Sequence, residues 1–120
     1  MQIVSLVIAM RQVYFISHPE VVINAEVPIT KGPLSDKGID RMTTLLRLPW
    51  GKDIRSIYSS EEQKAVDGAN IMAKHLSTHV TPCAYLGEMD CSSTGFLPCE
   101  EFESVADQFF AHPTESVRGW

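Results

Sequence analysis

Apolar and polar positions along the chain predict strands that alternate with helices. Residues 13–16 (Val-Tyr-Phe-Ile) form an unbroken apolar run with two β-branched members, which predicts a strand buried on both faces. Pro19 cannot continue a central strand, so we expect the strand to end at Ser17 and to leave His18 at its carboxyl end. Ligands bind at that edge of open α/β sheets. A single histidine beside an apolar run is also typical of a structural residue, and this segment alone does not decide between the two.

Three helices are predicted from apolar residues at helical spacing. Ser35 is a suitable N-cap for the first helix, which ends at the Pro-Trp-Gly sequence of residues 49–51. The second begins with Ser-Ser-Glu-Glu at 59–62, and the third ends at His112-Pro113. The apolar positions of the three faces are Ile39, Met42, Leu45 and Leu46, then Ala65, Ala69, Met72, Ala73 and Leu76, then Phe102, Val105, Ala106, Phe109 and Phe110.

Two more strands are expected between these helices, at residues 54–58 and 80–86, with Pro82 placing the second near a sheet edge. This alternation predicts βαβ units and an α/β fold with a mainly parallel sheet. Residues 1–12 are too short an apolar stretch to cross a membrane and lack a signal-peptide pattern. We therefore expect residues 1–12 to be an N-terminal extension or an extra strand ahead of a domain over 13–120.

Composition narrows the possible partners. The formal net charge of −5 at pH 7 gives no overall attraction to nucleic acid or to an anionic membrane, so neither is an expected partner. A hydrophobic content of 44% is enough for one domain with a packed core. The cysteines at 83, 91 and 99 fit neither a zinc pattern nor a disulfide set, so we expect reduced thiols in a cytoplasmic protein. His75 and His79 are expected to be solvated rather than a metal pair.

Five short motifs, in this order, resemble those of the histidine phosphatase (phosphoglycerate mutase-like) superfamily. Ser17-His18-Pro19-Glu20, with Asn24, is similar to that family's Arg-His-Gly-Glu signature and its following Asn. The other four are Leu-Ser-Asp-Lys-Gly at 34–38, Ser-Ser-Glu-Glu-Gln-Lys-Ala at 59–65, Leu-Gly-Glu at 86–88 and Glu-Ser at 115–116. They resemble Leu-Ser/Thr-x-x-Gly, Ser-x-x-x-Arg-Ala, Leu-x-Glu and Gly-Glu-Ser, respectively.

The resemblance implies a three-layer α/β/α sandwich and phosphoryl transfer that needs neither metal nor cofactor. His18 would be the nucleophile that forms a phosphohistidine, because neutral imidazole is a good nucleophile near neutral pH. Glu88 would protonate the leaving alkoxide and then activate water. Lys64 would hold phosphate oxygens, with Ser17 and Asn24 as neutral hydrogen-bond donors. The implied partner is a small phosphorylated substrate, and both mutase and phosphatase activity stay open.

The chain departs from the family pattern at several positions. Ser17 and Lys64 stand where the family has arginines, and neither offers the planar fork with which a guanidinium binds phosphate. Pro19 replaces a glycine and removes a backbone N–H. The family's second essential histidine has no counterpart here, so we expect a domain that lacks its C-terminal part. We also expect little phosphatase activity from these 120 residues alone, and an open sheet edge that favours a homo-oligomer.

Two classes of function remain after the sequence is considered. The first is an enzyme that hydrolyses a phosphomonoester or transfers its phosphoryl group through His18. The second is a degenerate, noncatalytic domain that binds a phosphorylated ligand or a protein partner. The replaced arginines and the missing C-terminal part favour this second class, whereas the retained His18 and Glu88 favour the enzyme. Two of the site residues also have a purely structural interpretation. Glu88 also fits an ordinary loop carboxylate, and Lys64 also fits a solvated helix lysine.

Overall fold

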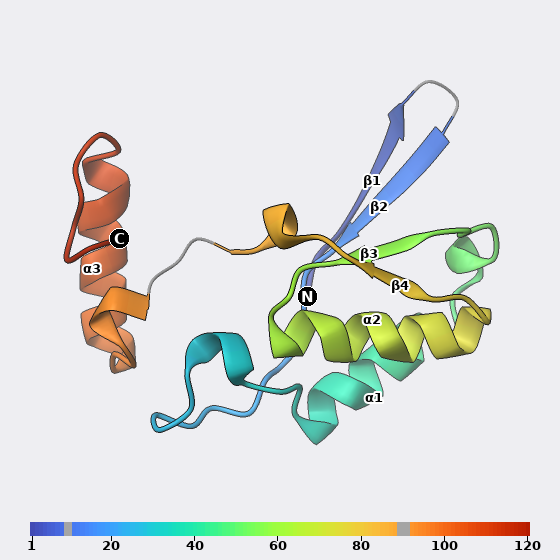
Figure 1. Cartoon of the computed structure of the whole chain (residues 1–120), viewed down its shortest axis with the longest axis horizontal. Coiled ribbons are helices and arrows are strands. Elements are labelled where there is room, and N and C mark those ends of the chain that lie inside the picture. Colours follow the sequence, from blue (N-terminus) through green and yellow to red (C-terminus); the bar gives the residue numbers. More distant parts are fainter. Residues whose placement is uncertain (9–10, 89–91) are drawn as a thin grey trace. The chain divides into compact units, whose positions relative to one another are not determined.

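The computed structural model describes residues 1–8, 11–88 and 92–120 and divides the chain into two compact units (Figure 1). The first unit comprises Met1–Ile23 and Thr30–Gly87, and the second comprises Asn24–Ile29 and Glu88–Trp120. The first unit carries strands β1 to β4 and helices α1 and α2, whereas the second carries α3. Short 3₁₀ helices lie at Ile29–Lys31, Pro49–Gly51, Ala84–Leu86 and Ser92–Thr94.

The first two strands form an antiparallel hairpin, β1 (Ile3–Ile8) with β2 (Arg11–Ile16). The prediction that the apolar run in β2 is buried on both faces is wrong, because only Tyr14 and Ile16 in this strand are half-buried. These two side chains lie on one face, where the Tyr14 ring packs on Trp50 with centroids 4.7 Å apart. A short apolar run fits a strand covered on one face as well as one covered on both.

Helix α1 (Asp36–Leu45) begins where the sequence predicts. The side-chain oxygen of Ser35 accepts a hydrogen bond from the Gly38 backbone N–H at 3.1 Å, so the N-cap prediction is confirmed. The helix buries Met42 and Leu45. The core of the first unit consists of Leu34, Met42, Leu45, Ile57, Met72 and Ala73.

Strands β3 (Ile57–Ser59) and β4 (Val80–Pro82) pair in parallel, with α2 (Gln63–Leu76) between them in the sequence. Figure 1 shows α2 running along this strand pair with α1 beside it. The expected βαβ unit is therefore present, and the fold is α/β. The described strands form two two-stranded sheets, one antiparallel and one parallel, so the expected three-layer sandwich with a mainly parallel sheet is not confirmed.

Several boundaries around this βαβ unit differ from the prediction, and β3 begins at Ile57 instead of at residue 54. Helix α2 begins at Gln63 rather than within 59–62, because Ser59 still belongs to β3 and its carbonyl accepts a hydrogen bond from Cys83 N at 2.7 Å. The Ser59 hydroxyl is also occupied, since it donates to the Ser60 carbonyl oxygen at 2.8 Å. Strand β4 ends at Pro82 instead of continuing to residue 86, because proline has no N–H to extend the ladder.

In the second unit, α3 (Cys99–Ala111) packs against the last residue of the chain. The Trp120 ring lies 5.4 Å from the Phe102 ring and 6.2 Å from the Phe109 ring, measured between centroids. These contacts use the apolar face that the sequence predicts. Phe110 is an exception, because 73% of it is exposed.

Cys83 and Cys99 are free thiols, and Cys91 lies outside the described residues. Among the described helices, none combines the length and apolar character needed to cross a bilayer.

Candidate active site

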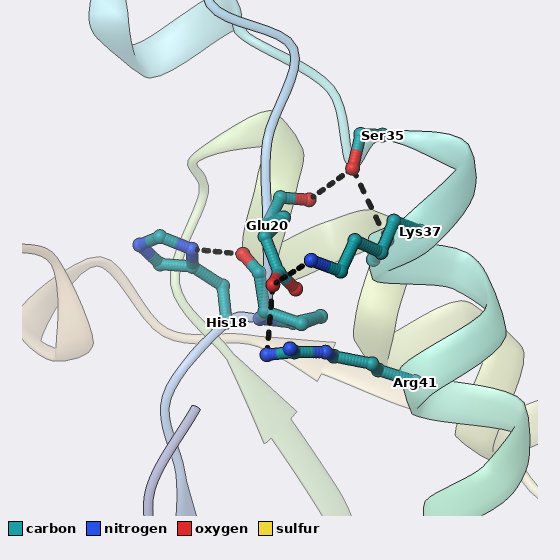
Figure 2. A network of polar contacts seen from close by, with 7 residues as sticks. His18, Glu20, Ser35, Lys37 and Arg41 are labelled. Atoms are coloured by element: carbon teal, nitrogen blue, oxygen red, sulfur yellow. Dashed lines mark hydrogen bonds and ion pairs between the residues drawn. The ribbon is translucent and has the colours of Figure 1, made fainter.

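His18 follows β2 closely, and its ring is oriented by the next residue in the chain. The imidazole Nδ1 lies 2.7 Å from the carbonyl oxygen of Pro19 (Figure 2). A carbonyl oxygen only accepts hydrogen bonds, so this contact assigns the proton of the neutral ring to Nδ1 and the lone pair to Nε2. Pro19 is buried and His18 is half-buried, so the acceptor is held inside the unit while the ring lies near its surface. The turn therefore favours the tautomer in which Nδ1 carries the proton.

The backbone after His18 is attached to the first turn of α1. The carbonyl oxygen of Glu20 accepts a hydrogen bond from the Ser35 N–H at 2.9 Å and another from the Ser35 hydroxyl at 3.1 Å. Gly38 permits this close approach, because a Cβ there would overlap the Glu20 carbonyl oxygen. The segment 34–38 therefore fixes the position of the histidine turn.

The Glu20 side chain connects the same turn to two basic residues of α1. Its Oε1 lies 2.7 Å from the Arg41 guanidinium and 3.6 Å from Lys37 Nζ, as Figure 2 shows. Loss of water around Glu20 raises the pKa of its carboxyl, but a backbone hydrogen bond and the charges of Arg41 and Lys37 outweigh this effect. The pKa of Glu20 therefore lies below its ordinary value. Its other oxygen, Oε2, is buried without a hydrogen-bond partner among the described residues.

Lys64 lies in the first turn of α2 and is only 6% exposed. Burial excludes its interpretation as a solvated helix lysine. The same helix buries Gly68 and Met72, so Lys64 belongs to a stripe with a spacing of four residues. That spacing was a signal in the sequence for a lysine on the inner face of the helix. A buried ammonium is costly unless charges or hydrogen bonds compensate it, which distinguishes Lys64 from an ordinary surface lysine.

A comparison with protein-family models decides the family. The model of the histidine phosphatase superfamily (branch 1) matches residues 13–116 of the 120-residue chain. The chain belongs to the histidine phosphatase superfamily. The match includes all five motifs, which begin at Ser17 and end at Ser116. No curated protein matches the sequence. Membership of the superfamily supports a phosphatase or mutase-like function in general.

Ser17 occupies the arginine position of the histidine phosphatase signature, and it is exposed at the end of the hairpin. Its backbone N–H donates to the Gln2 carbonyl at 3.0 Å, while its side-chain oxygen accepts from the Gln2 N–H at 2.7 Å. The hydroxyl keeps its own hydrogen for donation, as a phosphate ligand requires. Its role at a phosphate group stays a prediction.

Asn24 and Glu88 belong to the second unit and are described within it. The Asn24 side-chain oxygen accepts a hydrogen bond from the Glu26 N–H at 2.9 Å, which closes a local turn. Both residues are exposed. The structure thus brings together His18, Pro19, Glu20 and the first turn of α1, and the roles expected for Asn24 and Glu88 beside His18 remain predictions.

Sequence reasoning assigned no role to Lys37 and Arg41. These residues are four apart on α1 and therefore lie on one face of the helix, which was the available signal. It did not reveal that Glu20 lies opposite them.

The described residues contain no group of three or more His, Cys, Asp or Glu side chains that could hold a metal ion.

Proposed function

We propose that this domain transfers a phosphoryl group from a small phosphomonoester to Nε2 of His18, and from there to water or a second acceptor. Membership of the histidine phosphatase superfamily supports the general class of reaction. The observation that carries the proposal is the 2.7 Å contact between His18 Nδ1 and the Pro19 carbonyl. It holds the proton on the nitrogen that does not react and so maintains the nucleophile at the other.

In the proposed first step, Nε2 forms a bond to phosphorus while the bond from phosphorus to the alkoxide breaks. Glu88 transfers its proton to the departing oxygen. In the second step, the Glu88 carboxylate removes a proton from water as the water oxygen attacks phosphorus, and His18 is released as a neutral ring. The Pro19 carbonyl faces the Nδ1–H in both steps, so it stabilises the positive charge that develops on the phosphorylated ring.

Lys64 is the proposed source of positive charge for the phosphoryl oxygens. Its burial supports this role, because a charge acts more strongly in a region of low dielectric than at an exposed surface. Ser17 and Asn24 are proposed as neutral donors to the same group. Arg41 is paired with Glu20 at 2.7 Å, so we assign it to holding the turn rather than to phosphate.

Covalent trapping on the full chain tests the proposal. The protein is incubated with acetyl phosphate or with an aryl phosphate and quenched in base, where phosphohistidine survives, and the modified residue is located by peptide mass spectrometry. We expect modification at His18 and none in His18→Ala. The chain has four histidines, so His75, His79 and His112 are internal controls, and His79→Ala is the matched variant.

Two results would contradict the phosphohistidine mechanism. One is equal labelling of the His18→Ala protein. The other is saturable binding of inorganic phosphate with no covalent product at His18, which would instead identify a noncatalytic phosphate-binding domain. Circular dichroism of His18→Ala confirms that any loss of labelling is not caused by unfolding.

A further inference from the structure

We propose that Asp67 of α2 is a positioning residue for phosphoryl transfer, because it attaches the helix that carries Lys64 to the segment that holds the His18 turn. The role rests on the proposed function, in which His18 and Lys64 approach the same phosphoryl group. Asp67 lies three residues after Lys64, so the two are neighbours on the surface of the helix. It also lies two residues beyond the motif at 59–65, which left it without a role.

Both oxygens of the Asp67 carboxylate accept a hydrogen bond. Oδ2 accepts from the Leu34 backbone N–H at 3.1 Å, and Oδ1 accepts from Gln63 Nε2 at 2.7 Å. Gln63 lies one turn earlier on α2, so its bond fixes the direction of the carboxylate. The bond to Leu34 crosses from α2 to a distant part of the chain, and an ionised acceptor makes such a bond stronger than a neutral one does. Asp67 therefore attaches α2 to the backbone at residue 34.

Residues 33–35 are bonded on their other side to residues 20–22. A backbone hydrogen bond of 2.9 Å and an antiparallel bridge join the two segments. Ser35 adds two bonds to the Glu20 carbonyl, one of them from its hydroxyl, as Figure 2 shows. Hydrogen bonds therefore connect α2, through residues 33–35, to the backbone two residues from His18.

The separation between His18 Nε2 and Lys64 Nζ depends on how α2 lies against residues 33–35. The turn carries His18, the helix carries Lys64, and both belong to the first unit. Apolar packing in the core holds these elements together without a preferred direction, whereas the Asp67 hydrogen bond has a defined geometry. The nucleophile and the cation have to meet one phosphoryl group at the same time, and a misplacement of about 1 Å costs on the order of 10²-fold in rate. The bond from Asp67 to Leu34 sets this alignment.

The initial rate of phosphohistidine formation at His18 tests the role of Asp67, measured on the full chain at increasing concentrations of acetyl phosphate. Asp67→Ala removes the acceptor for the Leu34 N–H. We expect the maximal rate per folded molecule to fall about 10- to 100-fold, while the half-saturating concentration changes by less than about threefold. Lys64 still attracts the phosphate group in this variant but no longer holds it in line with the nucleophile. A purely structural residue would lower the folded fraction, measured by circular dichroism, and leave the rate of the folded molecules unchanged.

Three further variants separate position from charge and from folding. Asp67→Asn keeps an oxygen acceptor for the Leu34 N–H, so its rate should stay within roughly threefold of wild type, since only the charge assistance is lost. Asp67→Leu fills the same space with a strong helix former and should show the same loss as Asp67→Ala. Asn70→Ala truncates an exposed side chain of the same helix and is the matched control, with an unchanged rate expected.

Three results would overturn the positioning role. They are a wild-type rate in folded Asp67→Ala or Asp67→Leu, a rate for Asp67→Asn as low as that of Asp67→Ala, and an equal loss in Asn70→Ala. Absence of labelling at His18 in the wild type is a different result, because it would contradict the proposed function itself and the role of Asp67 with it.

Discussion

The Arg41 guanidinium lies 2.7 Å from the Glu20 carboxylate, so α1 holds the histidine turn by charge as well as through its backbone. The backbone attachment consists of two hydrogen bonds from Ser35 to the Glu20 carbonyl. The carbonyl and the carboxylate of Glu20 are therefore both engaged, by the N-cap residue Ser35 and by Arg41 of α1, and Glu20 lies two residues from His18. The position of Nε2 depends on how α1 packs against this turn.

Replacing Glu20 with glutamine should remove a pH-dependent part of the stability. Loss of water raises the carboxyl pKa, but a backbone hydrogen bond, Arg41 and Lys37 bring it below its ordinary value of 4.5. The folded state therefore favours the ionised form, and this stabilisation is present above the unfolded-state pKa and is lost as pH falls through the folded-state pKa. Thermal unfolding of the wild type and of Glu20→Gln should differ most near neutral pH and converge as the pH falls below the folded-state pKa, which itself lies below 4.5. Glu61→Gln is an exposed control, and parallel pH profiles for wild type and Glu20→Gln would contradict the ion pair.

Gly38→Ala should destabilise the first unit, whereas Gly68→Ala should not. Both glycines are buried in helices, but a Cβ at Gly38 would overlap the Glu20 carbonyl oxygen. A Cβ at Gly68 would lie 3.7 Å from Met42 Cε, an ordinary contact. We expect Gly38→Ala to lower the free energy of unfolding by about 1–3 kcal/mol, and Gly68→Ala to raise it by about 0.5–1 kcal/mol. Urea denaturation measures both, and equal effects would show that the turn yields to the added methyl group.

Features that depend on one side chain and its neighbours in sequence were predictable. The Ser35 cap is an example, because the hydroxyl and the N–H that it satisfies are three residues apart. The motif order also led to the correct superfamily, since it depends only on residue types and their sequence. The contact at Pro19 was missed for a local reason. Proline was considered for the N–H that it lacks, while its carbonyl provides the acceptor for His18.

Features that depend on distant segments were not predictable in the same way. The burial of β2 depends on what packs on its two faces, and Trp50, distant in sequence, packs on the face that carries Tyr14. The start of α2 depends on the hydrogen bond between Cys83 and Ser59, residues far apart in sequence. The partner of Arg41 lies on a different segment, so helical spacing predicted its face but not its contact with Glu20. In each case the deciding interaction joins two parts of the chain that no local pattern relates.

The hairpin should promote self-association of the chain. Val4 pairs with Phe15 and Leu6 pairs with Val13, so the four side chains lie on one face, and each is between 39% and 55% exposed. A continuous apolar face of this kind is typical of an interaction surface. We propose that a second copy covers it, because a two-fold interface places the same patch of both copies against each other, and an apolar face is complementary to itself. Sedimentation velocity should show concentration-dependent dimers that Leu6→Lys removes. Tyr85→Lys replaces a fully exposed aromatic outside the hairpin and should leave the dimer intact, so a monomer at all concentrations would be evidence against this surface.

Lys64 should determine how tightly the domain binds a phosphate group. Because Lys64 is 6% exposed, Lys64→Met keeps the apolar part of the side chain inside and removes only the charge. We expect this variant to lose about 1.5–3 kcal/mol of binding free energy for inorganic phosphate or vanadate, the value of a charge-assisted hydrogen bond. Lys64→Arg should retain or improve the affinity, because a guanidinium offers two parallel donors to phosphate. Lys74→Met, in the exposed last turn of the same helix, provides the matched control. Calorimetric titration measures the affinities, and circular dichroism checks that each variant is folded. A folded Lys64→Met protein that binds phosphate as the wild type does would assign the buried ammonium to the structure of the unit and not to its ligand.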